Sequence, residues 1–176
     1  DRLIMVDHKG EVVDGDELIF IIAKAKLAAG ELQGPVVGTL MTNLGMEHAL
    51  KSLGVDLVRA NVGDRYVMQQ MKKHNSQIGG EGSGHIICLD KTTTGDGIVA
   101  ALQVLAEVRK SGKSLYDLKS EMKKYPQVLL NVKIEKKIDI AKSDVIQKAV
   151  TLAEKTLADK GRVLLRASGT EPLIRV

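Results

Sequence analysis

The chain has 176 residues, 44% of them apolar, and its 26 basic and 22 acidic side chains give a formal net charge of +4. This length and composition are typical of a globular protein with one large or two small domains, and they exclude a disordered chain. With three Tyr, one Phe and no Trp, the sequence lacks the aromatic platforms on which nucleic-acid bases stack, so we expect an anionic small molecule and no nucleic acid as partner.

Cysteine content and hydropathy indicate where the protein works. The single cysteine, Cys88, lies in an apolar run and excludes a disulfide framework, which favours a reducing compartment. No apolar run approaches the length of a membrane span, and the N-terminus has no signal-peptide pattern. We therefore expect a cytoplasmic protein with no membrane partner. Because the chain begins at Asp1 without an initiator methionine and stops at Val176 inside a predicted strand, we also expect a fragment of a longer polypeptide.

The region before Pro126 alternates apolar strand-like runs with helix-periodic segments, the pattern of a layered α/β domain. Strands are expected at residues 3–6, 36–41, 56–60, 77–80 and 85–89. Helices are expected from Asp14 or Asp16 to about 29, from Thr42 or Asn43 to about 54, over 64–74, over 97–110 after Asp96, and from Ser114 to about 124. Each predicted helix follows a residue type that caps helices, and Ser114 with Asp117 resembles a capping box.

After Pro126 the pattern changes to strand, helix, strand, strand. The strands are expected at 127–135, 161–166 and 172–176, and the helix from Ser143 or Asp144 to about 160. This order predicts a second, smaller α+β unit with an antiparallel sheet. The boundary between the two units is expected within residues 112–126.

The C-terminal segment 166–176 brings together the side chains of a phosphate site. Arg166 and Arg175 supply forked, charge-assisted donors, while Ser168 and Thr170 supply short hydroxyl donors. Gly169 lets successive backbone N–H groups point into one concavity, as an anion nest requires. Because Ser-Gly-Thr is also ordinary turn chemistry, a solvated hairpin turn is the alternative.

The glycine-rich segment 80–85 places an anion, a hydroxyl and an imidazole within a few residues. Glu81 and Ser83 are two positions apart, so in extended backbone they face the same side and can bind neighbouring hydroxyls of a sugar. His85 lies one further step of two along and can exchange a proton near neutral pH. A surface loop with His85 at the start of a strand is the alternative.

Other polar segments are weaker candidates. Asp1 offers one carboxylate to a hard cation, although one carboxylate does not make a metal site. Segment 90–97 is a polar loop that opens a helix, and capping by Asp96 explains most of it, with a secondary role in shaping a sugar pocket. Segments 14–16 and 62–66 are explained by helix capping. His8, His48, His74 and Cys88 lack the spacing of zinc ligands.

Three of these segments occur in order, and together they resemble the α-D-phosphohexomutase superfamily. Its members carry a metal loop Asp-Gly-Asp-Gly-Asp-Arg, a sugar-binding loop Gly-Glu-x-Ser-Gly-His and a phosphate loop Arg-x-Ser-Gly-Thr-Glu-Pro-x-x-Arg. Asp1-Arg2 is similar to the end of the first, residues 80–85 match the second, and residues 166–175 match the third. Residues 42–47, 62–67, 89–99 and 161–166 resemble the phosphoglucosamine mutase branch, and the likeness spans essentially the whole chain.

The resemblance implies a particular domain organisation. Residues 1–6 would be the tail of a metal-binding domain 2, and residues 7–118 a sugar-binding α/β domain 3 with a mixed sheet. Residues 119–176 would be a truncated phosphate-binding domain 4, a smaller α+β domain with an antiparallel, TATA-binding-protein-like sheet.

The resemblance also implies an activity, the interconversion of glucosamine 6-phosphate and glucosamine 1-phosphate in UDP-N-acetylglucosamine synthesis. A phosphoserine and a bisphosphorylated sugar would carry the phosphate, and Mg²⁺ would offset its charge. By resemblance, Asp1 binds the metal and Arg2 and His85 act in catalysis. The substrate would be bound by Glu81, Ser83, Arg166, Ser168, Gly169, Thr170 and Arg175.

The chain departs from the family pattern because the phosphoserine and two of the three metal-binding Asp residues are absent. We therefore expect this fragment alone to be inactive. A phosphomannomutase or phosphoglucomutase of the same superfamily and a non-catalytic sugar-phosphate binding module are the alternative functions. The sequence does not determine the oligomeric state.

Overall fold

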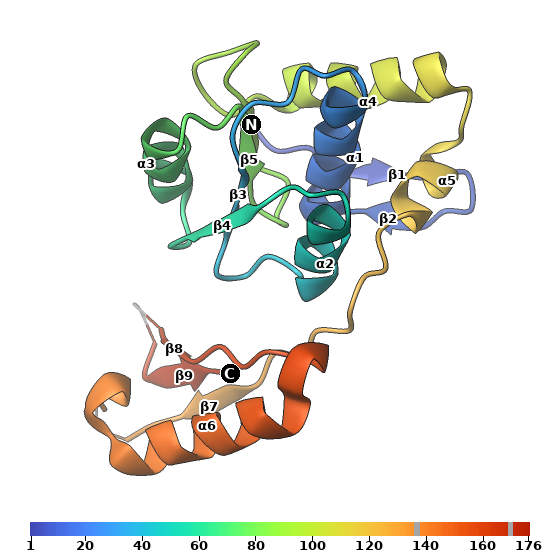
Figure 1. The fold of residues 1–176 in the computed structure, drawn as a ribbon. Coiled ribbons are helices and arrows are strands. Elements are labelled where there is room, and N and C mark those ends of the chain that lie inside the picture. Colours follow the sequence, from blue (N-terminus) through green and yellow to red (C-terminus); the bar gives the residue numbers. More distant parts are fainter. Residues whose placement is uncertain (136–137, 169–170) are drawn as a thin grey trace. The chain divides into compact units, whose positions relative to one another are not determined.

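The computed structural model describes residues 1–135, 138–168 and 171–176. The chain forms two compact units, Asp1–Tyr125 (unit 1) and Pro126–Val176 (unit 2) (Figure 1). Unit 1 ends within the expected boundary range of 112–126 and includes residues 119–125, because Met122 is buried in its core and Tyr125 is hydrogen-bonded to Asn43. Within the described residues, no helix has the length and apolar character needed to cross a membrane.

Unit 1 is built on a four-stranded mixed sheet, as expected. The strand order is β4-β3-β5-β6, in which the first three strands are parallel and β6 runs antiparallel to β5. The strands of unit 1 are β1 (Met5–Val6), β2 (Val12–Val13), β3 (Val36–Thr39), β4 (Leu57–Ala60), β5 (Ile78–Gly80) and β6 (Ile86–Cys88). Its helices are α1 (Gly15–Ala28), α2 (Leu44–Ser52), α3 (Asp64–Lys73), α4 (Gly97–Ser111) and α5 (Leu115–Ser120). The expected strand at 3–6 is shorter and pairs with β2 in a small antiparallel hairpin.

Helix caps follow local sequence closely. Of the two acidic candidates, Asp14 caps α1, and its carboxylate accepts hydrogen bonds from the N–H groups of Asp16 and Glu17. Asn43 caps α2, and the capping box of Ser114 and Asp117 is confirmed.

The helix after Ser114 ends earlier than expected. Helix α5 stops at Ser120 rather than near residue 124. The residue before a proline disfavours helical backbone, which limits any helix that approaches Pro126. In addition, Tyr125 forms backbone hydrogen bonds to the side chain of Asn43 instead of helical ones.

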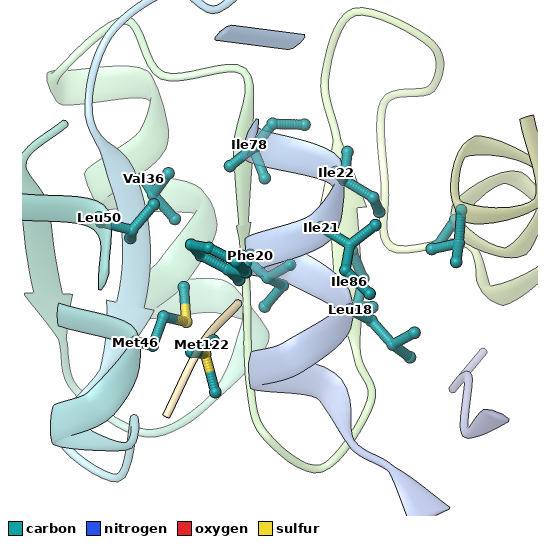
Figure 2. Packing of buried hydrophobic residues seen from close by; sticks show 14 of the residues in the cluster. Leu18, Phe20, Ile21, Ile22, Val36, Met46, Leu50, Ile78, Ile86 and Met122 are labelled. Carbon is teal, nitrogen blue, oxygen red and sulfur yellow. The ribbon is translucent and has the colours of Figure 1, made fainter. Parts of the chain in front are cut away.

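Hydrophobic clusters cover both faces of the sheet because successive strand residues point to opposite sides. On β3, Val36 belongs to the larger cluster and Val37 to the smaller one. Helix α1 supplies the larger cluster with a continuous buried run from Leu18 to Ala23. Figure 2 shows Phe20 of this helix lying near Val36, Met46 and Met122. The smaller cluster contains Val67 and Met71 of α3, so the two helices cover opposite faces.

Unit 2 has a three-stranded antiparallel sheet in the order β7-β9-β8. Its strands are β7 (Asn131–Lys133), β8 (Arg166–Ala167) and β9 (Leu173–Arg175), and its helix is α6 (Asp144–Leu157), flanked by the 3-10 turns Ile140–Lys142 and Ala158–Lys160. Ser143 is the N-cap residue of α6 and makes no side-chain capping bond. The strand expected at 127–135 was predicted too long, since only Asn131–Lys133 of it forms β7, and the strand expected at 161–166 shares only Arg166 with β8.

Candidate sugar-phosphate site

The glycine-rich segment forms a hydrogen-bonded turn between β5 and β6. Gly80 pairs with Ile86, and the Glu81 N–H donates to the carbonyl oxygen of His85 at 3.0 Å. Gly80 and Gly84 have φ angles of +155° and +94°, a backbone region that only glycine adopts readily. We call residues 81–85 the sugar loop. Its sequence is thus explained by backbone geometry as well as by the chemistry of its side chains.

The side chains of Glu81 and Ser83 meet, although the backbone between them is a turn and not the extended stretch expected from their spacing. The Ser83 hydroxyl donates to Glu81 Oε2 at 3.2 Å, while Glu81 Oε1 accepts the backbone N–H of Gly63 at 2.7 Å. Gly63 is the N-cap of α3 and makes no side-chain capping bond. The partial positive charge of this helix end favours a carboxylate there. The two side chains together form a small group of polar atoms suited to the hydroxyls of a sugar.

Segment 62–66 therefore contributes more than the sequence indicated. Its residues were explained as a helix start, yet the N–H of Gly63 orients the Glu81 carboxylate. The signal available in the sequence was Gly63, which precedes a helix and has no side chain with which to cap it. It could not identify Glu81 as the group bound there, because the two residues are 18 positions apart.

His85 lies at the end of the sugar loop and is mostly buried. Its Nε2 is 3.3 Å from Asp1 Oδ1, whereas the Asp1 side chain is 80% exposed. A Cβ on Gly95 would overlap the His85 imidazole, so the polar loop 90–97 packs directly against this ring. A Cβ on Gly97 would approach the Arg2 carbonyl oxygen at 2.7 Å, which places the start of α4 beside the N-terminal residues. The structure thus brings Asp1 to His85 and leaves Arg2 exposed.

Backbone hydrogen bonds from the start of α1 and from the N-terminal segment hold the sugar loop in place. The Gly15 N–H donates to the carbonyl oxygen of Gly82 at 3.0 Å, and the Leu3 N–H donates to that of Gly84 at 2.9 Å. A Cβ on Gly15 would overlap the Glu81 carbonyl oxygen and approach the Gly84 nitrogen at 2.7 Å. Sequence reasoning explained segment 14–16 by helix capping alone and missed this support, since the contact joins parts of the chain far apart in sequence.

Asp16 does not cap α1 but lies buried beneath the sugar loop, with 3% of its surface exposed. Its Oδ2 accepts the backbone N–H of Asn43 at 2.8 Å. Its Oδ1 has no hydrogen-bond partner among the described residues. Burial raises the pKa of this carboxyl to about 6, against the opposing effect of the Asn43 N–H.

The described residues do not form a magnesium site on their own. Among them, no three His, Cys, Asp or Glu side chains lie close enough together to hold a metal ion. Mg²⁺ needs an octahedral set of oxygen ligands, and Asp1 supplies one exposed carboxylate.

The C-terminal segment forms an antiparallel hairpin in unit 2 that joins its two arginines. Arg166 of β8 pairs in register with Arg175 of β9, so the two side chains leave the same face of the sheet. The Ser168 hydroxyl accepts the N–H of Glu171 at 3.2 Å, and Arg175 donates to the Glu171 carboxylate at 3.2 Å. Gly169 and Thr170, the remaining predicted phosphate ligands, lie outside the described residues.

Models of one protein family match both units of the chain. The family model described as "Phosphoglucomutase/phosphomannomutase, alpha/beta/alpha domain III" matches residues 14–125, and that of the C-terminal domain of the same family matches residues 129–176. The chain belongs to this family. The resemblance inferred from three short segments is thus confirmed over nearly the whole sequence.

Two curated relatives that match the chain are phosphoglucosamine mutases. The phosphoglucosamine mutase of Methylococcus capsulatus is 64% identical over 176 residues, which is all of this chain and 39% of that protein. The phosphoglucosamine mutase of Hahella chejuensis is 58% identical, with 40% of its length covered. The chain therefore spans about 40% of the length of these relatives.

Solved structures of the family share the fold at low sequence identity. An N-acetylglucosamine-phosphate mutase in its substrate complex matches with a TM-score of 0.80 at 21% identity, covering 99% of this chain and 42% of the other. The N-acetylphosphoglucosamine mutase of Aspergillus fumigatus, in complex with GlcNAc-6P and magnesium, matches with a TM-score of 0.76 at 20% identity and covers 98% and 44%.

Proposed function

We propose that the chain is the sugar- and phosphate-binding part of a phosphoglucosamine mutase. The full-length enzyme would interconvert glucosamine 6-phosphate and glucosamine 1-phosphate through a phosphoserine and a bisphosphorylated sugar, in the synthesis of UDP-N-acetylglucosamine. Identity of 56–64% to curated phosphoglucosamine mutases supports this choice within the family. The observation that carries it is that one chain contains both the hydrogen-bonded polar pair Glu81 and Ser83 and the cross-strand pair Arg166 and Arg175.

The side chains divide the binding task by their chemistry. Glu81 and Ser83 bind sugar hydroxyls, because a carboxylate offers lone pairs beyond those used by the Gly63 N–H and the Ser83 hydroxyl. The buried imidazole of His85, beside Asp1, is placed to exchange a proton with a sugar oxygen. Asp1 would supply one of several Mg²⁺ ligands and Arg2 a positive charge near the transferred phosphate.

The C-terminal hairpin provides the anion site. Arg166 and Arg175 bind the phosphate that is not being transferred, together with Ser168, Gly169 and Thr170. Forked guanidinium donors match phosphate oxygens in geometry and charge. Hexosamine phosphate is therefore the proposed partner, and a cytoplasmic location stays a prediction from the cysteine content.

Turnover by the full-length protein tests the proposal. We expect interconversion of the glucosamine phosphates to exceed that of mannose and glucose phosphates, and preference for a neutral hexose would instead identify a phosphomannomutase or phosphoglucomutase. Binding without turnover of any of the three would identify a non-catalytic module. The 176-residue chain alone should show no turnover, and activity above background would contradict that expectation.

A further inference from the structure

Asp16 joins the sugar loop to a second segment of unit 1. The neighbouring Gly15 N–H donates to the Gly82 carbonyl oxygen, and the Asp16 carboxylate accepts the Asn43 N–H. A Cβ on Gly82 would lie 3.2–3.4 Å from all three atoms of the Asp16 carboxyl group. The carboxyl group therefore lies against the backbone of Gly82, the residue that separates Glu81 from Ser83 in the loop.

Asn43 extends this connection to the last residue of unit 1. Its Oδ1 accepts the N–H groups of Gly45 and Tyr125 at 2.9 and 3.0 Å, and its Nδ2 donates to the Tyr125 carbonyl oxygen at 2.8 Å. Asn43 is fully buried. A Cβ on Gly45 would overlap the Lys123 carbonyl oxygen, so the chain before Pro126 packs closely on the start of α2.

Tyr125 is also held by its ring. Its hydroxyl is 3.3 Å from His48 Nδ1, and the two rings meet edge to face with centroids 5.6 Å apart. The side chain and both backbone polar groups of Tyr125 are thus bound within unit 1. Tyr125 is the last residue of unit 1 before the chain continues into unit 2. It is bound to Asn43, whose N–H in turn binds the Asp16 carboxylate beside the sugar loop.

A neutral residue could accept the same N–H of Asn43 at a lower free-energy cost of burial. An asparagine at position 16 could accept the Asn43 N–H through its amide oxygen, without a buried charge. Asp16 Oδ1 is buried and accepts no hydrogen bond from the described residues. No such bond therefore offsets the cost of removing this oxygen from water. A carboxylate that is buried with one oxygen unpaired is more readily explained by a role in the site than by packing.

We propose that Asp16 and Asn43 are positioning residues, which hold the sugar loop and the end of unit 1 at Tyr125 to one buried point. The inference rests on the proposed function, because its consequence is the placement of Glu81 and Ser83 for the sugar. Charge matters here since a hydrogen bond to an ionised acceptor is about twice as strong as a neutral one. Ionised Asp16 therefore holds Asn43 more firmly than a protonated carboxyl or an amide would.

The charged groups that act on Asp16 set the direction of its pH dependence. Asp14 opposes its ionisation, whereas Lys124 and Arg59 favour it. Because burial raises its pKa to about 6, Asp16 is ionised at pH 8 and largely protonated at pH 5. The bond between Asp16 and Asn43, which keeps the carboxyl group against Gly82 of the sugar loop, is therefore expected to weaken as the pH falls through about 6.

The test compares Asp16→Asn with wild type in the full-length protein. We expect the KM for glucosamine 6-phosphate to rise about tenfold at pH 8, with kcat changed less than twofold. At pH 5 the ratio of the two KM values should approach one, since Asp16 of the wild type is then largely protonated and residue 16 is neutral in both proteins. The substrate phosphate also titrates near pH 6, but its effect cancels in this ratio. Asp56→Asn, a change at the exposed residue just before β4, should leave KM unaltered at both pH values.

Hydrogen exchange provides a readout that does not depend on turnover. In Asp16→Asn, the amide hydrogens of Asn43 and Tyr125 should exchange at least tenfold faster at pH 8. A KM ratio that is constant with pH, or unchanged exchange at both amides, overturns the proposal. If wild type has no mutase activity, the proposed function fails and the exchange measurement alone decides the inference. If Asp16→Asn does not fold, Asn43→Ser replaces it, and an unchanged KM in that variant overturns the proposal.

Discussion

Arg166 lies directly opposite Arg175 on neighbouring antiparallel strands of unit 2. Like charges in such a cross-strand pair destabilise a sheet. Glu171, which accepts from Arg175, offsets part of that charge. An anion bound between the two guanidinium groups would turn the remaining repulsion into attraction, so the same pair that weakens the empty hairpin favours a dianionic ligand.

This pair predicts opposite effects of one substitution on binding and on stability. Arg166→Gln should weaken binding of glucosamine 6-phosphate by about 10–100-fold, the effect of losing a charge-assisted hydrogen bond worth about 1.5–3 kcal/mol. The melting temperature without ligand should stay equal or rise, because repulsion from Arg175 is relieved. Calorimetric titration and thermal unfolding measure the two effects. Lys155→Gln, the same change of charge on α6, should alter neither, and a comparable loss of affinity there would reject a specific phosphate site.

Gly15 predicts a link between the start of α1 and sugar affinity. In Gly15→Ala the new methyl group would overlap the Glu81 carbonyl oxygen, so the sugar loop must move. We expect at least a tenfold rise in KM for the sugar phosphate in the full-length protein. Gly54→Ala is the matched control, because Gly54 has open space around it and a φ of +74°. It should cost about 1–2 kcal/mol of stability through backbone strain and leave KM unchanged; equal KM values in the two variants would contradict the assigned support.

Lys119 predicts how unit 1 responds to acid. Its ammonium group lies 2.7 Å from Asp7 and 2.8 Å from Glu11, and its hydrogen bond to Asp7 lowers the pKa of that carboxyl from 3.8 to about 2. Asp7 therefore contributes stability above pH 4 that is lost as the pH falls through about 2. Lys119→Met should lower the melting temperature at pH 7 by several degrees and move acid unfolding to higher pH.

Circular dichroism melts between pH 2 and pH 7 measure this effect. Lys113→Met removes a more exposed ion pair with Glu121 and serves as the control. It should have little effect, because exposed pairs contribute about 0–1 kcal/mol. Parallel acid curves for wild type and Lys119→Met would show that the Asp7 pair does not determine acid stability.

Cys88 is predicted to be unreactive in the folded protein. Burial and the nearby Asp90 raise the pKa of its thiol to about 11, and the residue is 1% exposed. Only the thiolate reacts with iodoacetamide, and at pH 8 about one thiol in a thousand is ionised. Alkylation followed by mass spectrometry should be at least 100-fold slower in buffer than in denaturant, whereas equal rates would show that β6 opens readily.

Local features were predictable from the sequence because each depends on neighbouring residues. The caps at Asn43 and Ser114 follow from side chains that bond the next turn of backbone. The contact between Glu81 and Ser83 was expected from their spacing, although a turn and not extended backbone brings the two side chains together. Strand lengths in unit 2 were overestimated, because the extent of a strand depends on a partner that is distant in sequence.

The sequence by itself determined the order of helices and strands apart from the short strand β2, the family, and the residue types offered to a sugar phosphate. Only the tertiary structure decided which distant groups orient them: Gly63 at Glu81, Gly15 under Gly82, and Asp16 at Asn43. The physical reason is the burial of α1 against the sheet, which brings its first turn beneath the sugar loop. A hydrophobic pattern predicts that such a helix is buried, but the contacts of its polar end depend on how the whole core packs.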